Sequence, residues 1–357
     1  MRAADVNPWR VLRRSVLRAV LLAAALGAVV PAGAAEARTP ADEAAEWIGR
    51  MNAALANRNY DGVFVQQLGD RRMTMRIIHR MQDGHLTERL LTVDGTSREF
   101  VRDGNELVSY FPDRRIVVVE KRPPGLGYIG GLPGFDPAGQ SFYELRDPER
   151  VRVQGRPARL ITVTPRDSWR FGYRFWIDEK TAMPVKTQLT GVGGEPIEEV
   201  TFATLMLPPR IEDELLKAGV DTEGFRWLRR DQPRSKPGDM LAWTTTGLPP
   251  GFRRKVAPGS VAGGPPKPTA LLVFTDGLAT VSVFVESASL PPLTSRTGEP
   301  RSNSGPAQLG AAAAFTAIIE GFRVTAVGEV PPQTVKSIAE SLRPVPESAA
   351  PLGLQRP

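Results

Sequence analysis

The chain has 357 residues, which is room for two ordinary domains, and its 41% hydrophobic and 24% charged residues exclude a chain that is disordered throughout. It contains no cysteine, which excludes disulfides, thiolate catalysis and cysteine-based metal sites. The formal charge is +7, but the first 37 residues hold five arginines against two acidic residues, so the remainder is only mildly basic. Mild basicity suits an acidic partner or an anionic lipid and disfavours nucleic acid, which needs a concentrated basic stripe.

Residues 1–37 have the pattern of an export signal. Four arginines between positions 10 and 18 precede the apolar run "AVLLAAALGAVV", which ends in small residues. This order is typical of a cleavable secretory signal peptide, and the run is short for a membrane span. We therefore expect a soluble, exported protein that is cleaved after Ala37 or after Ala34. An uncleaved membrane anchor is the alternative.

The first element of the mature chain is predicted to be an amphipathic helix that starts near residue 39. Thr39 can cap its N-terminus and Pro40 suits the first turn. Apolar residues recur behind them at helical spacing, at Ala44, Ile48, Met51 and Leu55. The helix is therefore expected to cover an apolar surface.

From residue 71 the apolar pattern changes to a period of two, which predicts strands. Asp-Gly pairs at 83–84, 94–95 and 103–104 separate short alternating runs, and Asp-Gly supplies the positive φ angles of tight hairpins. Later strands are predicted at 106–111, 115–121, 151–164, 170–177, 185–190 and 197–205. So many consecutive strands favour one large curved antiparallel sheet, or an unclosed β-barrel with covering helices.

A second unit is predicted after a basic, proline-containing connector. Residues 210–221 are predicted to form a short helix before this connector. Beyond the connector, the sequence predicts a hairpin around Asp276-Gly277, strands near 311–319 and 322–328, and a last helix over 331–342. This predicts a small antiparallel sheet packed on one helix, so the fold class is mainly β with α (α+β). The loop at 123–139 is expected to be irregular and mobile, and the long polar loop at 290–310 to be either mobile or functional.

The predicted organisation has five parts. They are a signal peptide (1–37), an N-terminal domain with a candidate lipid cavity (38–222), a basic linker (223–241), a C-terminal domain (242–345), to which the family resemblance described below assigns partner binding, and a disordered tail (346–357).

The sequence contains no motif that indicates a catalytic site. "GLGYIG" at 125–130 matches a dinucleotide fingerprint, but Pro133 and Pro137 forbid the helix that should follow it. The two histidines, His79 and His85, leave little scope for a metal site or a catalytic triad, and His79 is interpreted as a core or cavity-lining residue. We predict no enzymatic activity, no metal and no cofactor. An envelope hydrolase is the disfavoured alternative.

Aromatic residues gather on one face of the predicted sheet. Phe171, Tyr173 and Phe175 alternate along one strand and therefore point to the same side. The full set that could line a pocket for acyl chains is Phe64, Ile77, Phe100, Phe111, Phe171, Tyr173 and Phe175. The alternative is that these residues simply form a solid core.

Several segments resemble the RseB/MucB family of regulators of the sigma-E envelope-stress response. The most specific are "RFGYRFWIDEKTAMP" within 170–184 and "VGEVPPQT" at 327–334, and the resemblance runs from about Ala44 to Leu342. The sequence departs from the family pattern around 257–268 and 290–310, where glycine, proline and serine are abundant.

The resemblance implies an N-terminal domain similar to the lipoprotein carrier LolA and a C-terminal domain that binds a membrane anti-sigma factor of the RseA or MucA type. It further implies that binding shields the anti-sigma factor's periplasmic segment from proteolysis, and that lipopolysaccharide or another acyl-chain ligand weakens this binding. The predicted function is therefore negative regulation in the periplasm, with a LolA-type lipid or lipoprotein carrier as the alternative. The sequence leaves open whether the chain forms a homodimer.

Two basic groups are candidates for the partner surface. They are Arg226, Arg229 and Arg230 in the predicted linker and Arg253, Arg254 and Lys255 beyond it. Acidic groups of the partner or lipid phosphates would pair with them. The alternative is an ordinary solvated basic surface.

Overall fold

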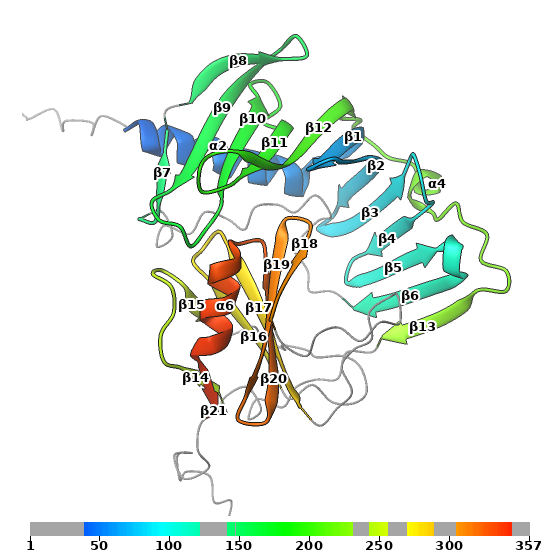
Figure 1. Cartoon of the computed structure of the whole chain (residues 1–357). Coiled ribbons are helices and arrows are strands. Elements are labelled where there is room, and N and C mark those ends of the chain that lie inside the picture. The colour runs from blue at the N-terminus through cyan, green and yellow to red at the C-terminus, as the bar shows by residue number, and fades with distance from the viewer. Residues whose placement is uncertain are drawn as a thin grey trace, which may run out of the picture. The chain divides into compact units, whose positions relative to one another are not determined.

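Strands dominate the fold and form two main sheets (Figure 1). The computed structural model describes residues 39–121, 141–146, 148–230, 243–255, 270–288 and 305–344. The predicted export signal (1–37), the predicted tail (346–357) and the loop predicted at 123–139 lie outside these residues. The predicted mainly β fold, with a large unclosed sheet and a small C-terminal sheet beside a helix, is confirmed.

Thirteen of the described strands form the large sheet, in the order β13-β6-β5-β4-β3-β2-β1-β12-β11-β10-β9-β7, with β8 beside β9. They are β1 (Tyr60–Leu68), β2 (Arg71–Gln82), β3 (His85–Thr92), β4 (Glu99–Asp103), β5 (Glu106–Phe111), β6 (Ile116–Lys121), β7 (Tyr143–Leu145), β8 (Glu149–Val153), β9 (Arg156–Pro165), β10 (Gly172–Asp178), β11 (Pro184–Thr190), β12 (Pro196–Met206) and β13 (Arg226–Arg230). The sheet is mixed, because β13 pairs parallel with β6 while the other pairs are antiparallel.

The Asp-Gly turns account for two of the hairpins. Asp83 and Gly84 have φ angles of 51° and 76° and join β2 to β3, where Gln82 pairs with His85. These positive angles are what a two-residue hairpin requires, so the prediction is confirmed here. Gly104 (φ 54°) likewise joins β4 to β5. Gly95 lies in a longer connection between β3 and β4.

The single strand predicted over 151–164 is wrong. Gln154 and Gly155 have φ angles of 49° and 79° and form a turn that divides this stretch into β8 and β9. The two strands pair with each other, with Val153 opposite Arg156. A glycine inside an alternating run is the sequence feature that indicates such a turn.

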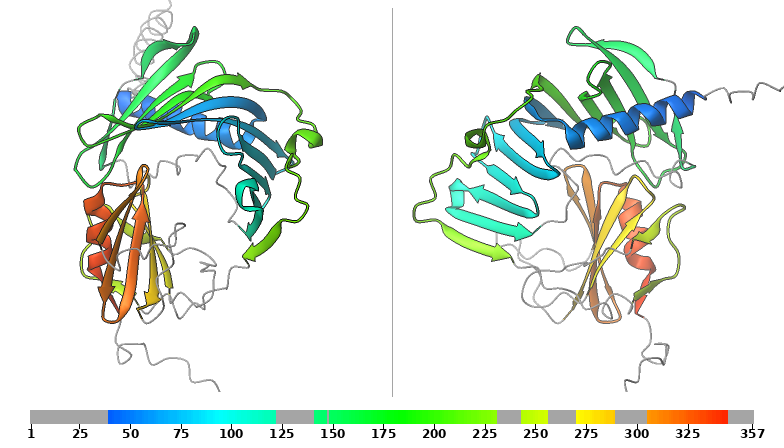
Figure 2. Two further views of the ribbon diagram at one scale, coloured as in Figure 1. Left: turned by 45° about the vertical axis from the view of Figure 1, so that its right-hand side comes forward. Right: turned by 180° about the vertical axis from the view of Figure 1, so that it is seen from behind.

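Helix α2 (Pro40–Asn57) packs on one face of the large sheet, whose strands curve around it (Figure 2). Its predicted apolar stripe is buried in the main core together with Phe64, Phe175 and Met183. The short helix predicted over 210–221 is limited to α4 (Asp213–Leu216), where Leu216 packs on Ile78. A single 3-10 turn, η1 (Pro112–Arg114), separates β5 from β6. None of the described helices combines the length and hydropathy needed to cross a membrane.

The predicted linker at 223–241 contains a strand. Arg226–Arg230 form β13, which pairs with Ile116–Glu120 of β6 and so extends the large sheet. Residues 231–242 lie outside the described part. A parallel partner more than a hundred residues away leaves no local trace in the sequence.

The small sheet has six described strands in the order β15-β16-β17-β20-β19-β18, and α6 packs on β19 and β20. Its elements are β15 (Arg253–Lys255), β16 (Ala270–Thr275), β17 (Thr280–Ser287), β18 (Gly305–Leu309), β19 (Ala312–Ile319), β20 (Phe322–Gly328) and α6 (Pro332–Ser341), and a separate pair joins β14 (Trp243–Thr245) to β21 (Leu342–Pro344). The end of the loop predicted at 290–310 is therefore the edge strand β18.

Candidate functional site

A cavity of about 510 Å³ lies beside α2 against the large sheet. Its wall is mainly apolar and includes Met51, Leu55, Phe64, Met75, Leu90, Phe100, Tyr173 and Phe175. These residues come from α2 and from strands β1 to β4 and β10, because alternate residues of each strand face the same side. The volume is within the range of roughly 300–1,000 Å³ that is usual for ligand pockets.

The seven aromatic and aliphatic residues predicted for a pocket divide into two groups. Phe64, Phe100, Tyr173 and Phe175 lie on the cavity wall. The other three lie elsewhere: Ile77 is fully buried in the core, Phe111 packs edge-on against Phe100 with ring centroids 6.2 Å apart, and Phe171 joins a separate cluster with Leu189 and Ala311. The aromatic face is therefore partly a solid core and partly an open wall.

Polar side chains also reach this wall, and the sequence interpretation missed them. Gln66 donates a hydrogen bond to Glu198, with 2.6 Å between Nε2 and Oε1. Glu329 follows β20 in the small sheet and still lines the cavity. Partial burial, and then the nearby Glu198 carboxylate, raise the pKa of Glu329 above its ordinary value. The cavity is thus built from both sheets.

Replacing Glu329 with glutamine should change how stability depends on pH. A carboxyl group with a raised pKa in the folded state contributes stability that is fully present below its unfolded pKa of about 4.3 and is lost as pH rises through the folded value. We expect the melting temperature of the wild type to fall relative to that of Glu329→Gln as pH rises from this value to neutral. Glu340→Gln, an exposed change on α6, is the control, and parallel wild-type and Glu329→Gln curves would contradict the expectation.

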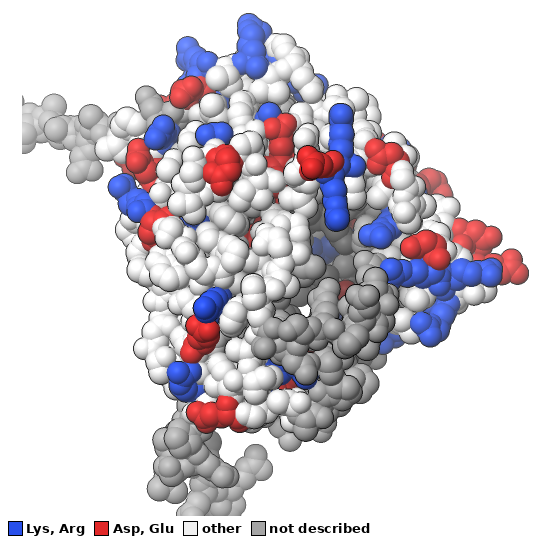
Figure 3. Space-filling model, viewed as in Figure 1, with Lys and Arg blue, Asp and Glu red and all other residues white. Residues whose placement is uncertain are grey.

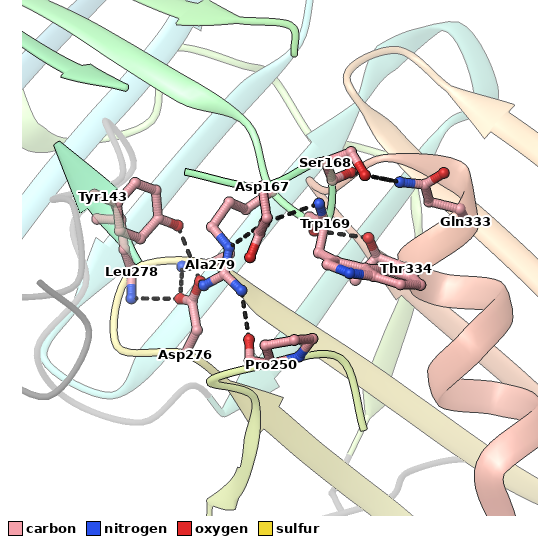
Figure 4. A network of polar contacts seen from close by, with 11 residues as sticks. Tyr143, Asp167, Ser168, Trp169, Pro250, Asp276, Leu278, Ala279, Gln333 and Thr334 are labelled. Atoms are coloured by element: carbon pink, nitrogen blue, oxygen red, sulfur yellow. Dashed lines mark hydrogen bonds and ion pairs between the residues drawn. The ribbon is translucent and has the colours of Figure 1, made fainter. Parts of the chain in front are cut away.

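A buried charge pair joins the two sheets (Figure 4). Arg170, between β9 and β10, is fully buried and places Nη1 2.5 Å from Oδ2 of Asp276, in the turn between β16 and β17. Arg170 also donates from Nε to Asp167 at 2.9 Å and from Nη2 to the carbonyl of Pro250. We refer to Arg170, Asp276, Tyr143, Asp167 and Pro250 as the Arg170 network.

Asp276 is the acceptor that holds the Arg170 network together. Its Oδ2 accepts from the hydroxyl of Tyr143 at 3.0 Å, and its Oδ1 accepts from the backbone amides of Leu278 and Ala279 at 2.9 and 2.7 Å. Burial and the Asp276 charge raise the pKa of Tyr143, which therefore stays a hydrogen-bond donor. With all of these partners present, the buried aspartate is well satisfied.

The start of α6 contacts the same loop of the large sheet. Gln333 donates to the carbonyl of Ser168 at 2.6 Å, and Thr334 donates to the carbonyl of Trp169 at 2.6 Å. Gln333 and Thr334, at the end of the stretch 327–334, thus contact Ser168 and Trp169, the two residues directly before the stretch 170–184. An apolar contact adds to it, because Leu278 is buried in the core of the large sheet.

The basic partner candidates lie on edge strands of two different sheets. Arg226 and Arg229 are exposed on β13 at one end of the large sheet, and Arg230 follows them. Arg253, Arg254 and Lys255 form β15 at an edge of the small sheet. Arg254 donates to the carbonyl of Trp243 at 2.9 Å and so has a structural role as well. On the face shown in Figure 3, lysine and arginine side chains are interspersed with acidic ones.

His79 is a core residue, in agreement with its interpretation as a core or cavity-lining histidine. It is buried, stacks on Tyr60 with ring centroids 4.4 Å apart, and places Nδ1 3.1 Å from Glu88. His85 lies on the surface beside Asp103. Within the described ranges, histidine, aspartate and glutamate do not gather into a group that would hold a metal ion.

Comparisons with known proteins match both parts of the chain. The family model for the MucB/RseB N-terminal domain matches residues 43–220, and the model for the MucB/RseB C-terminal domain matches residues 238–343. The sigma factor AlgU regulatory protein MucB of Pseudomonas aeruginosa is 32% identical over 321 residues, which cover 87% of this chain and 94% of that protein. The sigma-E factor regulatory protein RseB of Escherichia coli is 26% identical over 317 residues, covering 82% and 88%.

Solved structures agree. The complex of Pseudomonas aeruginosa MucA and MucB contains a chain that matches with a TM-score of 0.59 and 29% identity, covering 85% of this chain and 99% of that one. A crystal structure of MucB matches with a TM-score of 0.56 and 28% identity, covering 85% and 98%. Both domain models, a relative above 30% identity and the shared fold lead to one conclusion: the chain belongs to the MucB/RseB family of sigma factor regulatory proteins.

Proposed function

We propose that the chain is a periplasmic negative regulator without catalytic activity, which binds the periplasmic segment of a membrane-bound anti-sigma factor and shields it from proteolysis. Filling of the cavity by lipopolysaccharide or another acyl-chain lipid releases that segment. The names of the relatives, and the solved complexes of MucB with MucA, support the regulatory part of this proposal. The pattern of an export signal in residues 1–37 supports the location.

The observation that carries the lipid-release step is that one cavity has walls from both sheets. Glu329 lies on that wall, and four residues later Gln333 contacts the loop of the large sheet. A ligand in the cavity therefore touches the segment that leads into α6. A ligand shifts an equilibrium only by the difference between its affinities for the two states.

The energy needed for this shift is small. A tenfold preference for one arrangement corresponds to about 1.4 kcal/mol. Each buried methylene contributes roughly 0.8 kcal/mol, so two methylenes that are buried in only one arrangement are enough. Acyl chains are therefore suitable effectors for an apolar cavity of this size.

The test uses the mature protein and the periplasmic segment of the anti-sigma factor encoded by the same organism. We expect a complex in a pull-down, and we expect added lipopolysaccharide to weaken it at least tenfold. A protein that binds lipid but not the segment would instead be a carrier of the LolA type. A protein that binds the segment with unchanged affinity at saturating lipid would be a regulator without lipid control.

Charge reversal on β13 should slow association with the segment. Arg226→Glu and Arg229→Glu together replace two exposed cations at the sheet edge. Exposed charges act mainly on the association rate, so we expect the rate constant to fall several-fold and its salt dependence to weaken. Stopped-flow or surface plasmon resonance measures both. Arg150→Glu with Arg152→Glu on β8, also exposed, is the matched control, and equal effects of the two pairs would remove β13 from the partner surface.

A further inference from the structure

Arg98 lies on the cavity wall, and its side chain has a buried nitrogen without a hydrogen-bond partner among the described residues. It lies directly before β4 and opposite the end of β3, where its backbone amide donates to Oγ1 of Thr92 at 2.9 Å and its carbonyl accepts from the Thr92 amide at 3.0 Å. These bonds fix its backbone at the edge of the cavity. Its side chain lines the cavity next to Phe100 and Thr92.

The guanidinium of Arg98 lacks the partner that neighbouring arginines have. Its Nε is buried and has no hydrogen-bond partner in the part of the chain that the structure describes. On the adjoining strands, Arg76 pairs with Asp61 at 2.7 Å and Arg89 pairs with Glu99 at 2.6 Å. A buried polar group without a partner costs free energy. Because Nε is out of reach of solvent in this conformation, an anion in the cavity would offset that cost only with a rotation of the Arg98 side chain.

The surface next to Arg98 is suited to a hydrocarbon chain. Met73, Met75, Leu90 and Phe100 line this end of the cavity. Methionine side chains are flexible and polarisable, so they adapt to chains of different shape. An anionic group held by Arg98 would therefore have an apolar path for the rest of its molecule.

Acidic side chains lie on a different part of the wall. Glu198 is on β12, and in the sheet order β4-β3-β2-β1-β12 four strand spacings separate it from β4, which is about 19 Å along the sheet. Glu329 lies near Glu198, whose charge contributes to its raised pKa. An anion is therefore attracted at one end of the cavity and repelled at the other, which gives a bound amphiphile one orientation.

We infer that the cavity takes an acyl chain that carries an anionic group near one end, that this group pairs with Arg98, and that the chain extends along the apolar wall toward Phe64 and Phe175. The inference rests on the lipid binding proposed above and names the class of lipid. Arg98 is then a specificity-determining residue, since it distinguishes an acid from an uncharged lipid of the same length.

The experiment compares lauric acid with dodecanol, which have chains of equal length, as displacers of the neutral dye Nile red at neutral pH. A charge-assisted hydrogen bond favours the acid, so we expect the wild type to bind lauric acid at least tenfold more tightly than dodecanol. Arg98→Gln should lower the affinity for lauric acid to the level of that for dodecanol. The affinity for dodecanol itself should not change. Arg98→Lys should retain part of the preference.

Arg72→Gln is the matched control, because Arg72 is an exposed arginine beside Met73 on β2 whose side chain points away from the cavity. It should leave both affinities unchanged. Equal binding of acid and alcohol by the wild type, or an undiminished preference in Arg98→Gln, would overturn the inference while leaving lipid binding intact. Failure of every lipid to displace Nile red would instead overturn the proposed lipid binding itself.

Discussion

Replacing Asp276 with alanine should destabilise the protein by about 3–5 kcal/mol, the range expected when one partner of a buried ion pair is removed. Arg170 would remain fully buried without its carboxylate, and Tyr143 and the amides of Leu278 and Ala279 would lose their acceptor. The desolvated positive charge accounts for most of the cost, because a buried charge without a counter-ion is far less favourable than one in water. Urea denaturation, read as the shift in midpoint at constant slope, measures the loss.

Asp213→Ala is the matched control for this change. The Arg80–Asp213 pair has the same 2.5 Å separation as Arg170–Asp276, but the Asp213 side chain is 77% exposed. An exposed pair is screened by water and contributes far less than a buried one, so the two variants should differ several-fold in their effect. Asp276→Asn separates charge from hydrogen bonding, since it retains an acceptor for the two turn amides. Equal losses for Asp276→Ala and Asp213→Ala would mean that the Arg170 network does not hold the two sheets together.

The Arg170 network also bears on regulation. It joins the loop before β10 to the turn between β16 and β17, and the start of α6 contacts the same loop through Gln333. A ligand that moves the cavity wall would strain these contacts between the two sheets. Asp276→Ala should therefore alter the affinity for the anti-sigma segment as well as the stability, and the two effects can be measured separately.

Local sequence patterns were sufficient for most strands and for both long helices. The Asp-Gly pair at 83–84 fixed a two-residue hairpin, and the apolar stripe of α2 is buried as its helical spacing predicted. These features depend on neighbours within a few residues, so a single sequence contains them. The same reasoning explains the error at 151–164, where the turn at Gln154 and Gly155 was read as part of a strand.

Long-range pairings could not be predicted in this way. Asp276 was interpreted only as a turn residue, and nothing within its own segment indicates an arginine 106 positions earlier. The parallel pairing of β13 with β6 is also invisible locally. The candidate cavity was partly predicted, because alternation placed Phe175 and Tyr173 on one face, but whether such a face packs solidly depends on what covers it. Arg98 and Glu329 were missed for the same reason.

Filling the cavity should separate lipid sensing from partner binding. Val200 lines the cavity on β12, and Val200→Trp places an indole in the space that an acyl chain would occupy. Displacing about four methylenes at roughly 0.8 kcal/mol each costs the ligand about 3 kcal/mol, so the affinity for lauric acid should fall about a hundredfold. The stability should change little, because the substitution fills an existing void instead of crowding a packed core.

The matched control for Val200→Trp is Thr201→Trp, because adjacent residues of a strand point to opposite faces and Thr201 is not part of the cavity wall. Both variants should bind the anti-sigma segment like the wild type. We expect lipopolysaccharide to release the segment from Thr201→Trp and not from Val200→Trp, measured as the fraction retained in a pull-down. Release from both variants to the same extent, at a lipid concentration that the weakened cavity of Val200→Trp does not bind, would mean that lipid acts on the complex at another place.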